Sequence, residues 1–275
     1  MPKNTSIQPI TPWEQETITI TESREIRRLQ LNTFSDEIGE ALNVNKGLLY
    51  TFKGLTIAPG KTIRNYLGIG RYKVMNPLKY LLVLMTIFLL IAIPGGYFES
   101  IEKLQEIGGI NIENNGKNVT SAEAQEVQKM IMDYMHYYQE LFANYFNFWM
   151  ILTVGFISVF SYLLYKKRGY NFLEHLVVNL FAQAHVVIFM IVSAIFTPFV
   201  SFEINSMLIG ITTFLGYLYF IWVYKQVFQQ GLLKTIIKST IAYVFGASIF
   251  SILLAMIIFV IFFITHRETF TAIGF

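Results

Sequence analysis

The sequence predicts an all-α, polytopic integral membrane protein with five transmembrane helices, and three observations support this prediction. Hydrophobic residues make up 54% of the 275 residues and charged residues only 14%, whereas soluble domains usually carry about 25% charged residues. Five apolar runs each approach the roughly 20 residues that a helix needs to cross a bilayer. The segments between these runs alternate between basic and cation-poor composition, as they do in multi-pass proteins.

Composition also excludes several function classes. The chain has no cysteine, which excludes disulfides, thiolate catalysis and Cys-based zinc sites. The net charge of +3 is too small to indicate a nucleic-acid partner. The first apolar run starts after roughly 77 residues, so we expect the first transmembrane helix, rather than a cleaved signal peptide, to direct insertion.

The region before the first span divides into two parts. Residues 1–21 are rich in Pro, Thr, Ser and Gln, a composition that is typical of a flexible tail. Residues 22–77 show apolar residues at three- and four-residue steps and predict amphipathic helices, a first one up to about residue 45, a second at about 46–57 and a third at about 61–67. Pro59 and Gly60 separate the last two helices.

The second part of this region alternates cations with tyrosine and phenylalanine, which suits helices that lie in the lipid headgroup layer. The alternative is a soluble helical hairpin with a solvated basic face. Arg64, Tyr66, Arg71 and Lys73 are the candidate residues for contact with lipid or with a partner, because a guanidinium fork can bind a phosphate or a carboxylate. The same arginines can also serve only as positive-inside anchors.

The Gly60-Lys61-Thr62 triplet is not a phosphate-binding loop. Five residues separate Gly54 from Gly60, whereas the motif requires four, no strand precedes it, and Pro59 removes a backbone donor. We therefore expect neither a nucleotide nor any other cofactor.

The membrane domain is expected at residues 78–275. Its spans lie at about 78–97, 145–165, 176–199, 207–224 and 240–265. Residues 99–144 form an external segment in which Thr120, Ser121, Ala122 and Glu123 have the spacing of a capping box. The pattern predicts one unbroken helix from there through the second span, roughly 65 Å long, with tyrosine, phenylalanine and tryptophan at its point of entry into the membrane.

Orientation follows from the distribution of cations in the loops. Lys and Arg gather before the first span, after the second and before the fifth, while the opposite loops are acidic or lack cations. The positive-inside rule then places the N-terminus in the cytoplasm and the C-terminus outside the bacterial cytoplasmic (inner) membrane.

Two stretches carry a resemblance to a known family. Residues 47–80 (GLLYTFKGLTIAPGKTIRNYLGIGRYKVMNPLKY) and 169–181 (GYNFLEHLVVNLF) resemble a bacterial family of polytopic membrane proteins described as a domain of unknown function, DUF3667. The resemblance implies the multi-pass topology and no particular activity. Many family members begin with a Cys-rich zinc ribbon, which this chain lacks, so no zinc-dependent role is implied.

The third span holds a group of polar residues: Glu174, His175, Asn179 and Gln183. The last three are four residues apart and share one stripe, from which His185 points away. Polar residues at membrane depth mark pathways or sites, but here we favour hydration of Glu174 and His175 at the boundary and interhelical hydrogen bonds for Asn179 and Gln183. Two histidines ten residues apart on one helix do not make a metal site.

These patterns favour a non-enzymatic membrane protein that acts through contacts with lipids, with a protein partner or with a second copy of itself. The alternative is a small transporter or channel component that uses the polar stripe of the third span, as an oligomer because five short spans enclose little volume. A membrane-embedded enzyme ranks third, since no catalytic constellation is found.

Overall fold

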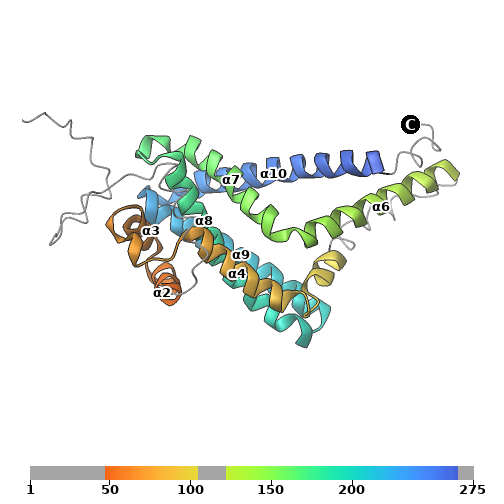
Figure 1. The fold of residues 1–275 in the computed structure, drawn as a ribbon, viewed down its shortest axis with the longest axis horizontal. Coiled ribbons are helices and arrows are strands. Elements are labelled where there is room, and N and C mark those ends of the chain that lie inside the picture. Colours follow the sequence, from red (N-terminus) through yellow and green to blue (C-terminus); the bar gives the residue numbers. More distant parts are fainter. Residues whose placement is uncertain (1–46, 105–121, 266–275) are drawn as a thin grey trace, which may run out of the picture.

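The computed structural model describes residues 47–104 and 122–265, and these are helical with no strand (Figure 1). The expected tail at 1–21, the helix up to about residue 45, most of the 120–123 capping box and the C-terminal residues 266–275 lie outside the described residues. The described elements run in the following order: α2 (Leu48–Ile57), α3 (Pro59–Leu67), η1 (Ile69–Tyr72), α4 (Pro77–Ala92), α6 (Ala122–Asn144), α7 (Phe146–Tyr165), η2 (Lys166–Arg168), α8 (Phe172–Phe196), η3 (Thr197–Phe199), α9 (Phe202–Phe228) and α10 (Leu232–Thr265).

Four helical stretches are long and apolar enough to cross a membrane, namely Phe146–Arg168, Phe172–Phe199, Phe202–Phe228 and Leu232–Thr265. A fifth span exists if α4 is counted together with the short helix Tyr97–Leu104, to which it is bent by 81°. The bend falls at Pro94, Gly95 and Gly96, where the sequence predicts the end of the first span. The protein is therefore an all-α, polytopic membrane protein.

The two ends of the molecule differ in construction. At one end, α2 and α3 pack beside the start of α4, and we call this pair the collar (Figure 1). At the other end, α6 and the second half of α10 extend away from the α4–α8–α9 bundle and approach each other (Figure 1), and we call α6 and residues 250–265 the arm. The buried side chains form two separate clusters accordingly, a large one in the bundle and a small one around Phe250, Leu254 and Ile258.

The expected unbroken helix through the second span is wrong at one point. Tyr145, with φ −113° and ψ 25°, separates α6 from α7, and the chain changes direction there (Figure 1). The indole Nε1 of Trp149 donates to the carbonyl of Leu141 at 3.2 Å, where the backbone N–H of Tyr145 also donates at 3.1 Å. A side chain that enters the backbone ladder in this way bends a helix, and the bend lets α6 follow α10.

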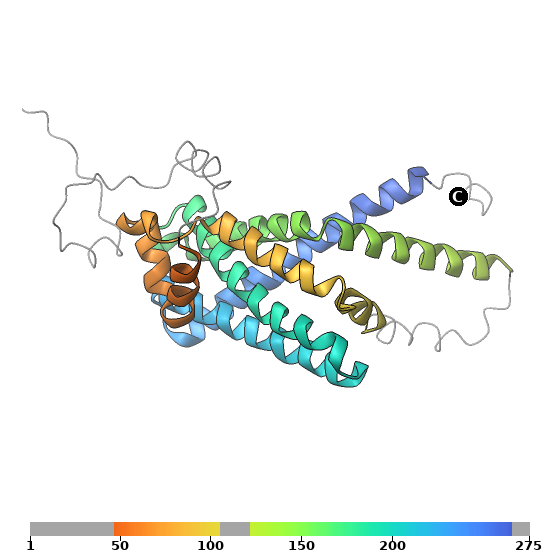
Figure 2. The same cartoon turned by 60° about the horizontal axis from the view of Figure 1, so that its bottom comes forward.

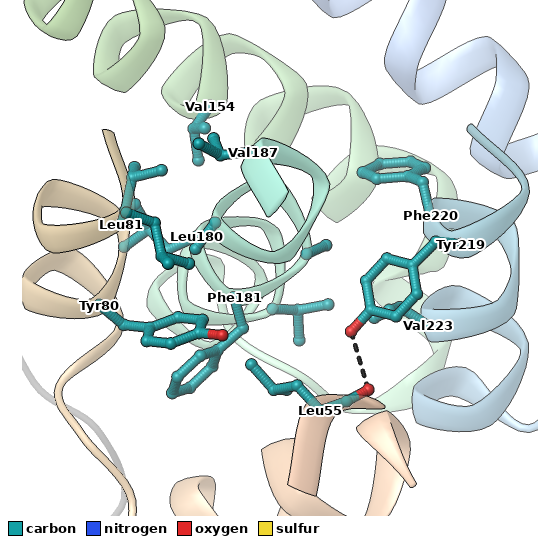
Figure 3. Close-up of a cluster of buried hydrophobic side chains, with 14 of the residues drawn as sticks. Leu55, Tyr80, Leu81, Val154, Leu180, Phe181, Val187, Tyr219, Phe220 and Val223 are labelled. Atoms are coloured by element: carbon teal, nitrogen blue, oxygen red, sulfur yellow. Dashed lines mark hydrogen bonds between the residues drawn. The ribbon is translucent and has the colours of Figure 1, made fainter. Parts of the chain in front are cut away.

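Helix α8 is the central helix of the bundle. Its start is fixed by a capping box, in which Asn171 Oδ1 accepts from the Glu174 N–H at 2.9 Å and Glu174 Oε2 accepts from the Asn171 N–H at 2.7 Å. Every residue from Val177 to His185 is buried, because α2, α3, α4, α7 and α9 surround this half of the helix. Figure 3 shows Leu180, Phe181 and Val187 of α8 enclosed by side chains of these neighbours.

Helix α4 is shorter than α8 and leaves the beginning of α8 without a neighbour on that side. Tyr80, the fourth residue of α4, contacts His185, the fourteenth residue of α8. The first ten residues of α8 therefore extend beyond α4, by about 15 Å at 1.5 Å per residue. Tyr66 of the collar packs on Phe181 and Phe228 of α9 packs on His175 within this length of α8, and Tyr66 and His175 are buried.

Candidate functional site

The predicted stripe of α8 faces α7. His175 Nδ1 lies 2.7 Å from Ser161 Oγ, Asn179 Nδ2 donates to Ser158 Oγ at 3.1 Å, and Gln183 Nε2 lies 3.3 Å from Met150 Sδ. The three side chains thus meet successive positions along one neighbouring helix. Interhelical hydrogen bonds of this kind hold membrane helices together.

Asn179 bonds to three helices of the protein itself. Its amide also donates to the carbonyl of His175 at 2.9 Å, and its Oδ1 accepts from the Tyr224 hydroxyl of α9 at 2.6 Å. Asn179 therefore ties α7, α8 and α9 together, and both N–H groups of its amide already bond within the protein.

The imidazole of His175 lies among aromatic rings. Phe228 stacks on it at 5.0 Å, while the rings of Tyr162 and Tyr170 stand nearly perpendicular to it at 5.8 and 6.2 Å. Its Nε2 is buried and has no hydrogen-bond partner among the described residues. The perpendicular rings allow an N–H to point at an aromatic face, which compensates part of the lost hydration.

Burial changes the expectation for the two boundary residues. Glu174 and His175 are 1% and 0% exposed, so protein rather than water surrounds them. Rings of α7, of the turn before α8 and of the end of α9 surround His175, at a level that the sequence places at the open membrane boundary. Glu174 acts as the N3 residue of the α8 capping box.

Sequence reasoning missed a second polar group on α8, centred on His185. Its Nδ1 lies 3.2 Å from the Tyr80 hydroxyl of α4, and its Nε2 lies 3.2 Å from the Thr56 hydroxyl of α2. Thr56 also donates to the carbonyl of Phe52 at 2.7 Å. Because a hydroxyl has one proton, Thr56 accepts from Nε2–H, and Nδ1 accepts from Tyr80.

Tyr219 of α9 completes this group. Its ring stacks on His185 at 4.7 Å, and its hydroxyl donates to the carbonyl of Leu55 at 3.0 Å (Figure 3). His185 and Tyr219 thus fasten the C-terminal end of α2 to the bundle. The spacing of α8 indicates that His185 points away from the stripe, but no periodicity in the sequence shows that α2 lies on that side.

The predicted contact residues of the collar have mixed surroundings. Arg64 donates to the carbonyl of Gln226, near the end of α9, and Arg71 Nε donates to the carbonyl of Tyr66 at 3.1 Å. Tyr66 is 2% exposed and packs edge-on against Phe181 at 5.1 Å, whereas Lys73 is exposed. A cation at a helix C-terminus complements the helix dipole, so Arg64 has a structural role at α9.

Close backbone approach fixes the collar on α9. The N–H of Gly60 donates to Gln226 Oε1 at 2.9 Å, and a Cβ at Gly60 would lie 2.8 Å from the Gln226 carbonyl carbon. A larger residue at position 60 would push α3 away from α9. In the described part of the chain, no group of three or more His, Cys, Asp or Glu residues could hold a metal ion.

The collar, η1 and most of α4 lie in a segment that matches a protein-family model. Residues 45–89 match the family model "Protein of unknown function (DUF3667)". This segment belongs to the DUF3667 family. The DUF3667 segment includes α2, α3, η1 and most of α4, and hence Thr56 and Tyr80, which hold His185. The chain matches no curated protein and no solved structure.

Proposed function

We propose that this chain is a non-enzymatic integral membrane protein of the bacterial cytoplasmic membrane, which acts through contacts of its collar with the lipids of the inner leaflet. The outward face of α2 carries this proposal. Leu49 is 80% exposed and Ile57 63% exposed, with Tyr50, Phe52 and Lys53 exposed between them. An apolar and aromatic face with adjacent lysine suits a helix in the headgroup layer.

The level of α2 in the bundle supports this position. Thr56 shares His185 with Tyr80, so the C-terminal end of α2 lies level with the first turn of α4, where the apolar helix begins. Figure 2 shows α2 and α3 beside this first turn. Side chains at this level are expected to meet the boundary between headgroups and hydrocarbon.

Charge supports the orientation. Among the described residues, the collar end holds one acid, Glu174, against the following cations: Lys53, Lys61, Arg64, Arg71, Lys73, Lys79, Lys166, Lys167, Arg168, Lys225, Lys234 and Lys238. The opposite end of the molecule, which includes the arm, carries mainly acids: Glu99, Glu102, Glu123, Glu126, Asp133, Glu140 and Glu203. Under the positive-inside rule the collar is cytoplasmic, with the N-terminus inside and the C-terminus outside.

Tryptophan fluorescence tests the proposal. In a full-length chain whose native tryptophans are replaced by phenylalanine, Phe52→Trp is reconstituted in nanodiscs with lipids brominated near the headgroup end of the acyl chain. We expect strong quenching at position 52 and little at a control tryptophan, Asp133→Trp, on the polar side of α6. Position 52 quenched by aqueous iodide but not by bromolipid would overturn the proposal.

The contact could instead involve protein, either a different partner or a second copy of this chain. Mass spectrometry of the chain purified in native nanodiscs separates these outcomes from the proposal. A stoichiometric protein that masks Phe52→Trp from bromolipid would replace lipid as the occupant of the α2 face.

A second candidate function is that of a small transporter or channel component. It is favoured by the buried Nε2 of His175, for which the described part of the chain supplies no hydrogen-bond partner, because unpaired polar groups at membrane depth can mark a pathway. Proteoliposomes with a trapped pH-sensitive dye test it. If this function is correct, vesicles with the wild-type chain leak protons faster than empty vesicles, and His175→Ala abolishes the difference. Equal proton leak in wild-type and empty vesicles would contradict it.

A further inference from the structure

The first turn of α4 concentrates positive charge. Asn76 caps the helix by accepting from the N–H groups of Leu78 and Lys79, and Lys79 occupies the third helical position. No acidic residue lies in this first turn. A helix N-terminus carries a partial positive charge that favours anions, so a lysine here is unfavourable unless an anion lies close by.

Lys79 is also deeply buried for a lysine. It is 8% exposed, and within the described residues its ammonium makes no hydrogen bond or ion pair. The ammonium nitrogen of Lys79 is nevertheless not fully buried, so it retains some contact with the surroundings of the protein. Burying an unpaired charge is costly, and Glu174, the one described acid of the collar end, already holds the Asn171 N–H.

The position of Lys79 on its helix indicates where an anion would come from. Leu82 and Leu90 are 37% and 70% exposed, and Thr86 between them is also exposed. These residues follow Lys79 at steps of three and four and therefore share its side of α4. Lys79 thus lies at the collar end of a stripe of exposed, mainly apolar side chains.

A phospholipid presents its groups in the same order, a phosphate above an acyl chain. We infer that Lys79 binds the phosphate of an anionic inner-leaflet phospholipid, whose acyl chain lies along Leu82, Thr86 and Leu90. The inference rests on the proposed function, which places the collar in that leaflet. The adjoining apolar stripe favours a lipid over free phosphate, because free phosphate gains nothing from apolar surface.

Native mass spectrometry of the full chain in nonionic detergent, titrated with phosphatidylglycerol or phosphatidylcholine, tests this site. We expect tighter retention of phosphatidylglycerol, and about a fivefold loss of its affinity in Lys79→Gln, from roughly 1 kcal/mol per cation near an anionic headgroup. Lys79→Arg should retain wild-type affinity. The matched control, Lys129→Gln on α6, should leave the affinity unchanged.

Three results would overturn the inference: wild-type affinity in Lys79→Gln, an equal loss in Lys129→Gln, or complete displacement of the lipid by millimolar inorganic phosphate. The last would assign the site to free phosphate. If bromolipid quenches Phe52→Trp but Lys79→Gln keeps wild-type lipid affinity, only the phospholipid site at Lys79 is rejected. If lipid selectivity depends on Lys79 but bromolipid does not quench Phe52→Trp, only the proposed contact of α2 with lipid is rejected.

Discussion

The collar end and the arm end hold their helices together in different ways. At the collar end, the polar groups around His185 and Asn179 tie α2, α4, α7, α8 and α9 into one unit. In the arm, α10 packs on α6 mainly through aromatic rings, such as Tyr134 with Phe259 and Phe262 at 5.7 and 5.6 Å. The hydroxyl of Tyr134 adds a hydrogen bond to the carbonyl of Ala255 at 2.9 Å.

This difference has a physical meaning in a bilayer. Lipid tails are as apolar as leucine, so apolar burial alone hardly drives helices together, and close packing and interhelical hydrogen bonds decide their association. The collar end has both contributions in several directions. The arm has a single layer of ring contacts, so we expect the arm to separate from its neighbours at a lower free energy than the collar.

The largest effect is expected where α7 meets α10, the seam that joins the arm to the bundle. A Cβ at Gly246 would lie 2.6 Å from Ile157 Cα and 2.8 Å from its backbone nitrogen. Because backbone cannot move aside like a side-chain tip, Gly246→Ala should cost roughly 2–3 kcal/mol of unfolding free energy. Reversible unfolding in mixed detergent micelles measures this loss.

Gly210 provides the matched control, since a Cβ there meets nothing within 4 Å. Gly210→Ala should be neutral or slightly stabilising, because alanine favours helix over glycine by about 1 kcal/mol. Equal stability of the two alanine variants would show that the seam adapts to a methyl group and would contradict the close contact expected between α7 and α10.

A smaller effect is expected inside the collar end from Tyr80→Phe. The variant keeps the ring but removes the hydroxyl that donates to His185 Nδ1, which leaves a buried acceptor without a partner and should cost about 1–2 kcal/mol. Hydrogen exchange of α2 should speed up, because Thr56 depends on the same imidazole. Tyr50→Phe, on the exposed face of α2, should change neither quantity.

Much of the fold follows from sequence patterns because those patterns are local. Apolar runs predict the spans, Pro94 and Gly95 predict the end of α4, and the four-residue spacing correctly places His175, Asn179 and Gln183 on one side of α8. Each of these features depends on residues close together in the chain. The positions of the helices along the sequence can therefore be predicted without knowing the tertiary structure.

The missing parts depend on contacts between distant segments. Thr56 and His185 are 129 residues apart, and nothing in the periodicity of either helix indicates their pairing. The bend at Tyr145 follows from one indole hydrogen bond, that of Trp149, which helix propensity does not reveal. The burial of His175 similarly depends on Phe228 of α9, which is 53 residues away in the chain.

The smallest effect is expected in the arm, from Tyr134→Phe. Tyr134 is only partly buried, so water competes for the groups of its bond to Ala255, and the loss should be about 0.5–1 kcal/mol, below that of Tyr80→Phe. The chain has no cysteine, so spin labels at Met132→Cys and Ile261→Cys report the distance between α6 and α10 specifically. If Tyr134→Phe lost as much unfolding free energy as Tyr80→Phe, the prediction that the collar end is the more stable one would be wrong.

The same labels give a pH test of the arm. Burial raises the pKa of Tyr134, and burial followed by the influence of Tyr134 raises that of Tyr138. A raised folded-state pKa means that the contribution of the neutral phenols is complete below the ordinary value near 10 and is lost as pH rises through the raised one. We expect the α6–α10 distance to stay constant up to about pH 10 and to widen above it, with a smaller alkaline change in Tyr134→Phe because that variant has lost the hydroxyl already. If the α6–α10 distance widens well below pH 10, or widens equally in wild type and Tyr134→Phe, other groups cause the alkaline opening. The hydrogen bond of Tyr134 would then make no measurable contribution to the contact between α6 and α10.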